Sequence, residues 1–146
     1  MALLGTPIRS GRWLVVFEFN EKAISCDYSG LGISASPYNF TGFDTLFGTD
    51  GNSLMYHPSG ICNLRGTDIP GNQKWEKSSL KETKTPDGTQ QKVFYAGMEI
   101  EIEGNTSTVL FFANYSRQSH FFVGIPSPAV IGVCTLCNSF QLSLFS

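Results

Sequence analysis

The chain has 146 residues, of which 41% are hydrophobic and 15% are charged, and its net charge is −2. This length and hydrophobic content favour one folded domain over residues 1–146 and argue against an intrinsically disordered chain. The charge balance lacks the basic excess of nucleic-acid-binding domains. No stretch reaches the roughly 18 apolar residues of a membrane span. We therefore expect neither a nucleic acid nor a membrane as a partner.

Residues 1–10 lack the charged region and apolar segment of a secretory signal peptide. We interpret them as an N-terminal arm ahead of the first strand. A protein without such a signal stays in the cytoplasm or leaves the cell inside a particle, and a virion is the location that we expect.

The first strand is predicted at residues 13–19, where large apolar side chains recur at every second position. One face of this strand is fully apolar. The other face, which includes Leu14 and Val16, is partly apolar, and we expect it to be partly covered. Residues 20–22 are interpreted as a turn into a second strand at residues 23–28, which predicts a hairpin.

Residues 29–71 contain eight glycines and three prolines, which divide the chain into short apolar pieces. This texture predicts short strands joined by turns rather than helices. The strands are expected at residues 38–40, 45–47, 54–56 and 61–64.

The most polar stretch, residues 74–92, holds five of the six lysines. The turn signal Pro86-Asp87-Gly88 has polar residues on both sides, so residues 76–91 are predicted to form a polar hairpin that projects past the core, or a disordered loop. A solvated surface is the simplest interpretation of the lysines, and a phosphate-binding strip is the alternative. A single helical turn is expected only at residues 80–84.

The clearest hairpin signal lies in residues 98–113. Three apolar residues alternate with three glutamates, and Gly104-Asn105 then supplies a two-residue loop. Pairing Ile100 with Val109 places the apolar side chains of both strands on one face. A shift by one residue would set Glu101 opposite Val109, so the hydrophobic pattern selects the two-residue loop.

Three further strands are predicted at residues 120–123, 129–136 and 140–144. The second of these is apolar on both faces, as expected of a strand that is covered on both sides. No segment shows the 3.6-residue period of an amphipathic helix. The predicted fold is all-β: an antiparallel β-sandwich, jelly roll or irregular β-barrel of about eight to ten short strands with little or no helix.

The four cysteines are Cys26, Cys62, Cys134 and Cys137. Without a secretory signal, we expect buried, reduced thiols, with a disulfide as the alternative. Cys134 and Cys137 match a C-x-x-C pattern, but positions i and i+3 of a strand face opposite sides. We therefore expect no metal ion and no cofactor, although a metal or redox pair remains an alternative.

The sequence contains no evident catalytic constellation. Its two histidines, His57 and His120, lie in no zinc-binding or triad motif, so we do not expect an enzyme. Glu99, Glu101 and Glu103 share one face of a predicted strand at a spacing of ~7 Å. Such a row indicates a solvent-facing or protected edge strand. A face toward a cation-rich partner, or a metal or carboxylate-pair site, is the alternative.

The tripeptide Gly11-Arg12-Trp13, at the start of the first strand, is similar to the G-x-W motif that opens many lipocalins. The resemblance covers three residues. It implies a closed β-barrel that binds a small apolar ligand near Trp13. A tryptophan that fills the core is the alternative.

The expected function is that of a non-catalytic structural subunit of a large homomeric assembly. Few charges, the missing catalytic constellation and the polar hairpin indicate a virus or phage particle component, such as a capsid decoration (cement) protein or a tail subunit. The expected partners are further copies of the chain and a second structural protein, such as a capsid or tail protein. The residues expected at the interface are Leu3, Leu4, Ile8, Leu80, Lys81, Lys84, Pro86, Asp87 and Phe145.

Two other functions fit the sequence. The first is the lipocalin-like barrel with a small ligand. The second is a glycan-binding module, in which an exposed Trp75, Tyr38 or Tyr56 would lie over a shallow sugar site.

Overall fold

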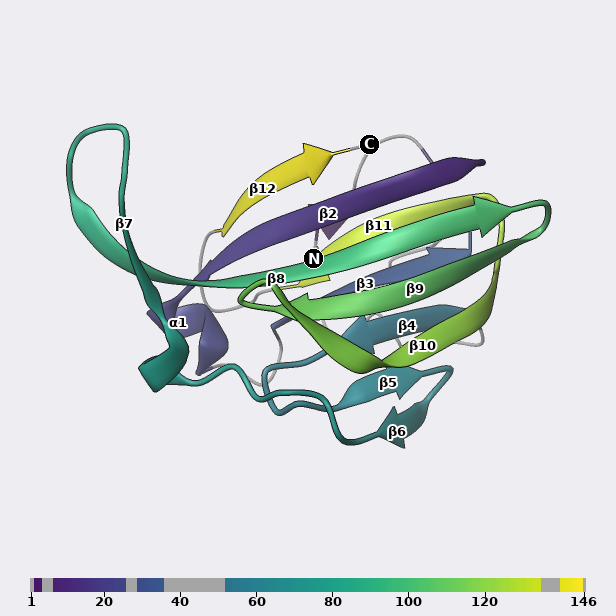
Figure 1. Ribbon diagram of the computed structural model, residues 1–146, viewed down its shortest axis with the longest axis horizontal. Helices are drawn as coiled ribbons and strands as arrows, with labels where there is room; N and C mark the ends of the chain where they lie inside the picture. Colours follow the sequence, from purple (N-terminus) through teal and green to yellow (C-terminus); the bar gives the residue numbers. More distant parts are fainter. Residues whose placement is uncertain (1, 4–6, 26–28, 36–51, 135–139, 146) are drawn as a thin grey trace.

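The computed structural model describes residues 2–3, 7–25, 29–35, 52–134 and 140–145. Within these residues the chain forms two antiparallel β-sheets that lie one over the other (Figure 1). The prediction of an all-β sandwich is confirmed. The described residues form twelve strands, slightly more than expected, because five of them have only two to four residues.

Sheet A has six strands in the spatial order β1-β11-β3-β4-β5-β6. Its strands are β1 (Ala2–Leu3), β3 (Gly30–Ala35), β4 (Ser53–Tyr56), β5 (Cys62–Leu64), β6 (Thr67–Ile69) and β11 (Ala129–Cys134). Sheet B has the order β10-β9-β8-β2-β12, and β7 pairs with the first part of β8. Its strands are β2 (Gly11–Asn20), β7 (Lys81–Lys84), β8 (Gln90–Glu103), β9 (Thr106–Ala113), β10 (Ser116–Pro126) and β12 (Phe140–Phe145).

The closed barrel implied by the resemblance to lipocalins is not what the chain forms, because the described strands make two open sheets. Trp13 is half-buried and packs against the edge of the core between them. Its indole N–H donates a hydrogen bond of 2.9 Å to the carbonyl of Ser10. Trp13 thus packs against the core, which was the alternative to a position beside a bound ligand.

The β8–β9 hairpin has the register that the hydrophobic pattern predicts. Ile100 opposes Val109, and Glu103 opposes Thr106. Gly104 has a φ of 59°, the left-handed first position that a type II′ two-residue loop requires. The register buries Ile100 and Val109 completely and leaves the glutamates of β8 on the opposite face.

The predicted hairpin between residues 13–19 and residues 23–28 is wrong. A short helix, α1 (Glu21–Ile24), follows β2 directly, and β2 pairs with β8 and β12 instead. Asn20 is the N-cap of this helix, since its side-chain oxygen accepts a 3.0 Å hydrogen bond from the backbone N–H of Ala23. The polar residues after β2 therefore begin a helical turn rather than a hairpin loop. Residues 26–28 lie outside the described residues.

Residues 81–93 form a hairpin between β7 and the start of β8 that extends beyond the rest of sheet B (Figure 1). At its tip, the N–H of Thr85 donates to the carbonyl of Thr89, and the N–H of Gly88 donates to the carbonyl of Thr85, both at 2.9 Å. The helical turn expected at residues 80–84 occurs earlier, as the 3₁₀ helix η1 (Lys77–Ser79), and residues 81–84 are strand.

The other predicted strands have mixed outcomes. The segments at residues 54–56 and 61–64 correspond to β4 and β5, and the last three predicted strands fall in β10, β11 and β12. The strands predicted at residues 38–40 and 45–47 lie outside the described residues.

The core between the sheets is centred on an aromatic cluster around Trp75, which is 4% exposed. Its ring stacks on Phe94, with centroids 5.3 Å apart, and also contacts Phe19 at 4.8 Å and Tyr56 at 5.3 Å. Such aromatic pairs contribute about 0.5–1.5 kcal/mol each beyond the apolar area that they bury. Trp75 lies in the connection between β6 and η1, so this contact fastens that connection to both sheets.

The alternation along β9 predicts that replacing two neighbouring phenylalanines by alanine lowers the free energy of unfolding by different amounts. Phe111 is fully buried between Tyr56 and Phe122, whereas Phe112 is half-buried on the outer face of sheet B. Phe111→Ala should lower the free energy of unfolding by about 3–5 kcal/mol, and Phe112→Ala by no more than about 1.5 kcal/mol. Urea denaturation of both variants measures the difference. Equal losses would contradict the assignment of the two faces.

Candidate functional site

The outer face of sheet B combines apolar and charged side chains. Along β2, the side chains of Val15, Phe17 and Phe19 enter the core, so those of the intervening residues lie on the outer face. Leu14 on this outer face is 36% exposed.

A small apolar cleft lies in the middle of this face, with Gly97 as its floor. Gly97 of β8 stands between Val16 of β2 and Phe112 of β9, and its lack of a side chain leaves a hollow between theirs. The cleft has a volume of about 100 Å³ and is lined by Leu14, Val16, Tyr95, Gly97, Phe112 and Tyr115.

Position 97 favours glycine because there is little space for a Cβ atom, and not because of its backbone conformation. A Cβ atom there would lie 3.0 Å from the carbonyl oxygen of Val15 and 3.4 Å from Cγ2 of Val16. Glycine inside a strand often marks a place where another group approaches the backbone closely. Here it lets the outer face of a well-paired strand open into a cleft.

Tyr115 forms one wall of the cleft, and its side chain is the most exposed large hydrophobic group of the described residues, at 66%. It belongs to the two-residue loop between β9 and β10, where Asn114 and Tyr115 have φ values of 47° and 67°, as a type I′ turn requires. A bulky residue rarely adopts such a φ. The turn thus holds a strained tyrosine with its ring in solvent.

The side chain of Asn114 fixes this turn from both sides. Its oxygen accepts a 3.0 Å hydrogen bond from the backbone N–H of Tyr95, and its amide group donates to the carbonyl of Ser79. The rings of Tyr95 and Tyr115 lie with centroids 5.1 Å apart. Burial, the nearby Glu18 carboxylate and Tyr115 raise the pKa of the Tyr95 phenol, which therefore stays neutral at physiological pH.

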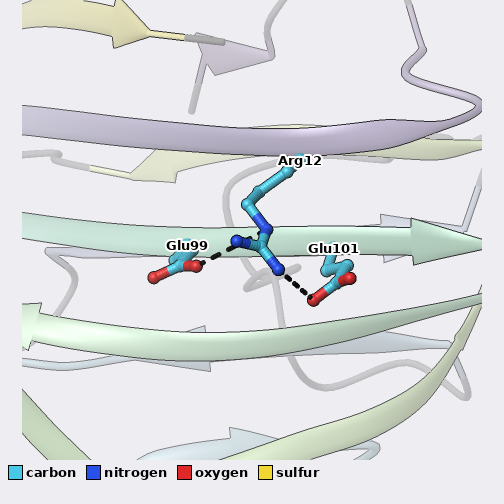
Figure 2. A network of polar contacts seen from close by, with 3 residues as sticks. All are labelled: Arg12, Glu99 and Glu101. Atoms are coloured by element: carbon cyan, nitrogen blue, oxygen red, sulfur yellow. Dashed lines mark hydrogen bonds and ion pairs between the residues drawn. The ribbon is translucent and has the colours of Figure 1, made fainter.

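Next to the cleft lies a charged group on the same face. Figure 2 shows Arg12 between the two carboxylates of β8: its Nη2 is 3.2 Å from Oε2 of Glu101, and its Nε is 4.0 Å from Oε1 of Glu99. A shallow depression of about 40 Å³ borders both glutamates and Arg117 of β10. Because these side chains are partly solvated, each ion pair contributes only about 0–1 kcal/mol to stability.

The residues predicted to form an interface lie in several elements of the described chain. Ile8 is buried and pairs with Ala129, and Leu3 pairs with Gly132 in sheet A. Leu80 is half-buried against the core, and Phe145 belongs to β12 in sheet B. The β7 hairpin carries the exposed Lys81, Lys84, Pro86 and Asp87, and Leu4 lies outside the described residues.

The cleft itself was not predicted from the sequence. The alternation along β2 indicates a partly apolar second face that includes Leu14 and Val16, but it does not indicate Gly97, Phe112 or Tyr115. The available signals were a glycine inside an otherwise continuous strand and an Asn-Tyr pair at the end of another. These signals indicate a cleft only when the order of the strands is known, since β2 is separated from β8 by about seventy residues of sequence.

Two of the three aromatic residues predicted for a glycan site, Trp75 and Tyr56, are not accessible to a sugar. Trp75 and Tyr56 are buried in the core, and the Tyr56 hydroxyl donates to the carbonyl of Gln73. Tyr38 lies outside the described residues. The expectation of an exposed Trp75 or Tyr56 is therefore wrong.

Cys62 is a buried free thiol that accepts a 3.0 Å hydrogen bond from Nδ2 of Asn72. Burial raises the pKa of this thiol to about 12, although the hydrogen bond opposes the shift, so it stays protonated and unreactive. Cys26 and Cys137 lie outside the described residues, and therefore the C-x-x-C pair is untested.

Within the described residues, no three His, Cys, Asp or Glu side chains are grouped so that they could bind a metal ion. In the same part of the chain, no helix has the length and apolar character needed to cross a membrane.

Comparison with known proteins identifies the fold. No family model matches the chain, and no curated protein sequence matches it. Among solved structures, the chain is similar to the SPRY domain of human HERC1, with a TM-score of 0.57 and 12% identity over 97% of this chain and 79% of that one. It is also similar to the TRIM65 PSpry domain, with a TM-score of 0.58 and 12% identity over 99% of this chain and 67% of that one. The likeness shows a SPRY-type β-sandwich.

This finding corrects the function expected from the sequence. The interpretation as a virus or phage particle subunit is wrong, because these two structures of the same fold are SPRY domains and not virion components. The same comparison favours neither the lipocalin-like barrel nor the glycan-binding module, and it supports neither self-assembly nor a capsid partner. Few charges and many aromatic residues are compatible with many kinds of β-sandwich. Composition therefore does not identify the class of function.

At the tip of the β7–β8 hairpin, the carboxylate of Asp87 accepts hydrogen bonds from two threonines. The hydroxyl of Thr85 donates to the carboxylate of Asp87, and the backbone N–H of Thr89 donates to it at 3.0 Å. These hydrogen bonds lower the pKa of the Asp87 carboxyl to about 2. The ionised carboxylate accepts these hydrogen bonds. Its contribution to the stability of the tip is therefore complete at pH values above ~3.9, the pKa in the unfolded chain, and is lost as the pH falls through about 2.

An NMR titration of the Asp87 carboxyl carbon should therefore give a midpoint near 2. Thr85→Val removes the main donor and should move the midpoint up toward ~3.9. Thr106→Val, in β9 and away from the tip, should leave it unchanged. A midpoint near ~3.9 in the unaltered protein would contradict the hydrogen-bonded tip.

Proposed function

We propose that this chain is a non-catalytic protein-interaction module that binds a partner protein through the outer face of sheet B. The observation that carries the proposal is the apolar cleft over Gly97, which opens to solvent beside Leu14 and Tyr115. SPRY domains such as those of HERC1 and TRIM65 are protein-interaction modules, and the shared fold supports the proposal.

The chemistry of the face suits protein binding. Tyrosine is enriched at interaction sites because it offers a large apolar area and a polar end at a low cost in conformational entropy. Tyr115 is held in the open by a turn that Asn114 fixes, so little ordering is needed when a partner binds. An apolar pocket with a charged side chain at each end also has the arrangement of an interaction hot spot with a polar rim.

The test uses peptides selected from a random display library on the purified chain. Binding of the selected peptides should weaken by about tenfold or more in Tyr115→Ala and in Leu14→Asp, because both changes remove an apolar wall of the cleft. Fluorescence anisotropy measures the dissociation constants, and thermal melting shows that each variant is folded.

Thr67→Asp is the matched control, since Thr67 is exposed on β6 of the other sheet and the substitution adds the same charge. It should leave binding unchanged. Peptides that bind the Leu14→Asp and Tyr115→Ala variants as tightly as the unaltered chain would overturn the proposal.

A further inference from the structure

The apolar cleft has a carboxylate at each end along the strands. Val16 and Gly97 are opposite each other at its centre. One step along the outer face in one direction, Leu14 opposes Glu99, and one step in the other direction, Glu18 opposes Tyr95. Because successive outward residues of a strand lie ~7 Å apart, both carboxylates are within reach of any chain seated over the cleft.

The cations on the same face do not balance these acids. Arg12 is shared by Glu99 and Glu101, so one guanidinium group serves two carboxylates. Arg117 lies on the β10 side, opposite Phe112. Four carboxylates thus face three cations among the described residues of the outer face: Glu18, Glu99, Glu101 and Glu103 against Arg12, Arg117 and Lys81, which opposes Val93.

The strands under the cleft limit how a partner binds. Gly97 belongs to β8, which is already paired with β2 on one side and β9 on the other, so its backbone groups are not open to strand addition. A bound segment must therefore be recognised by its side chains. A cleft of about 100 Å³ has room for one large apolar side chain and not for several.

We infer that the partner inserts one large apolar side chain over Gly97 and presents a lysine or arginine beside it, which meets the carboxylate of Glu18 or Glu99. This inference rests on the proposed function and adds the chemistry of the partner. A basic side chain at the Glu18 end of the cleft also lies close to the exposed ring of Tyr115, because Tyr95 opposes Glu18 and packs against Tyr115. A cation–π contact there adds to the attraction.

The experiment reads the sequences enriched from a random peptide library on three versions of the chain. On the unaltered chain, enriched peptides should carry one large apolar residue with Lys or Arg within two positions of it. Glu18→Gln combined with Glu99→Gln should weaken the binding of these peptides by about tenfold, and raising the salt concentration should have a similar effect. Glu18→Lys combined with Glu99→Lys should shift enrichment toward Asp and Glu.

Glu76→Lys combined with Glu82→Lys is the matched control, because it changes the net charge equally at two exposed positions outside the cleft. It should leave the enriched sequences unchanged. Apolar peptides that require Leu14 and Tyr115 but show no preference for basic residues would overturn this inference and leave the proposed function intact. If no enriched peptide requires Leu14 or Tyr115, the proposed function and this inference both fail.

A second copy of the chain is the remaining occupant to test. Light scattering over a concentration series should give the mass of a monomer. If the chain is a dimer and Tyr115→Ala dissociates it into monomers, the face binds another copy. That result would overturn the inference of a basic partner.

Discussion

The alternation of side chains along β8 is the constraint on which the rest of the structure depends. This strand lies at the centre of sheet B and pairs with β2, β9 and β7. Phe94, Ala96, Met98 and Ile100 enter the core, and the residues that alternate with them line the outer face. A slip of one residue would exchange these two sets and bury the glutamates, at a cost that no surface contact could offset. The same register that builds the core therefore also places the cleft and its charged border.

The two faces of sheet B have opposite packing requirements. On the inner face, Trp75, Phe94 and their neighbours fill the space between the sheets. On the outer face, Gly97 leaves a hollow at a place where strands disfavour glycine and where a Cβ atom would lie 3.0 Å from the carbonyl oxygen of Val15. Tyr115 is held at a strained φ with its ring exposed. Departures of this kind from local stability are concentrated where a fold carries its function. They are the reason to regard this face, rather than the β7 hairpin, as the interaction surface.

The sequence predicts the β8–β9 hairpin to the residue because its information is local: an alternating strand, a two-residue loop and a second strand. It does not predict α1, since a four-residue helix has no periodicity to detect and Asn20 suits a turn as well as a helix cap. The cleft is beyond sequence reasoning for a different reason. Val16 meets Gly97 and Phe112 only through the pairing of strands that are distant along the chain, and composition alone led to the wrong class of function.

The most direct measurement of the central claim, that the cleft over Gly97 is an apolar anchor site, is an NMR experiment with a small apolar probe such as phenol. Nuclear Overhauser effects should connect the probe to the methyl groups of Leu14 and Val16 and to the ring of Phe112, which line the cleft. They should be absent at the exposed residues of the β7 hairpin. Contacts that centre on the hairpin, or that spread evenly over the surface, would contradict the claim.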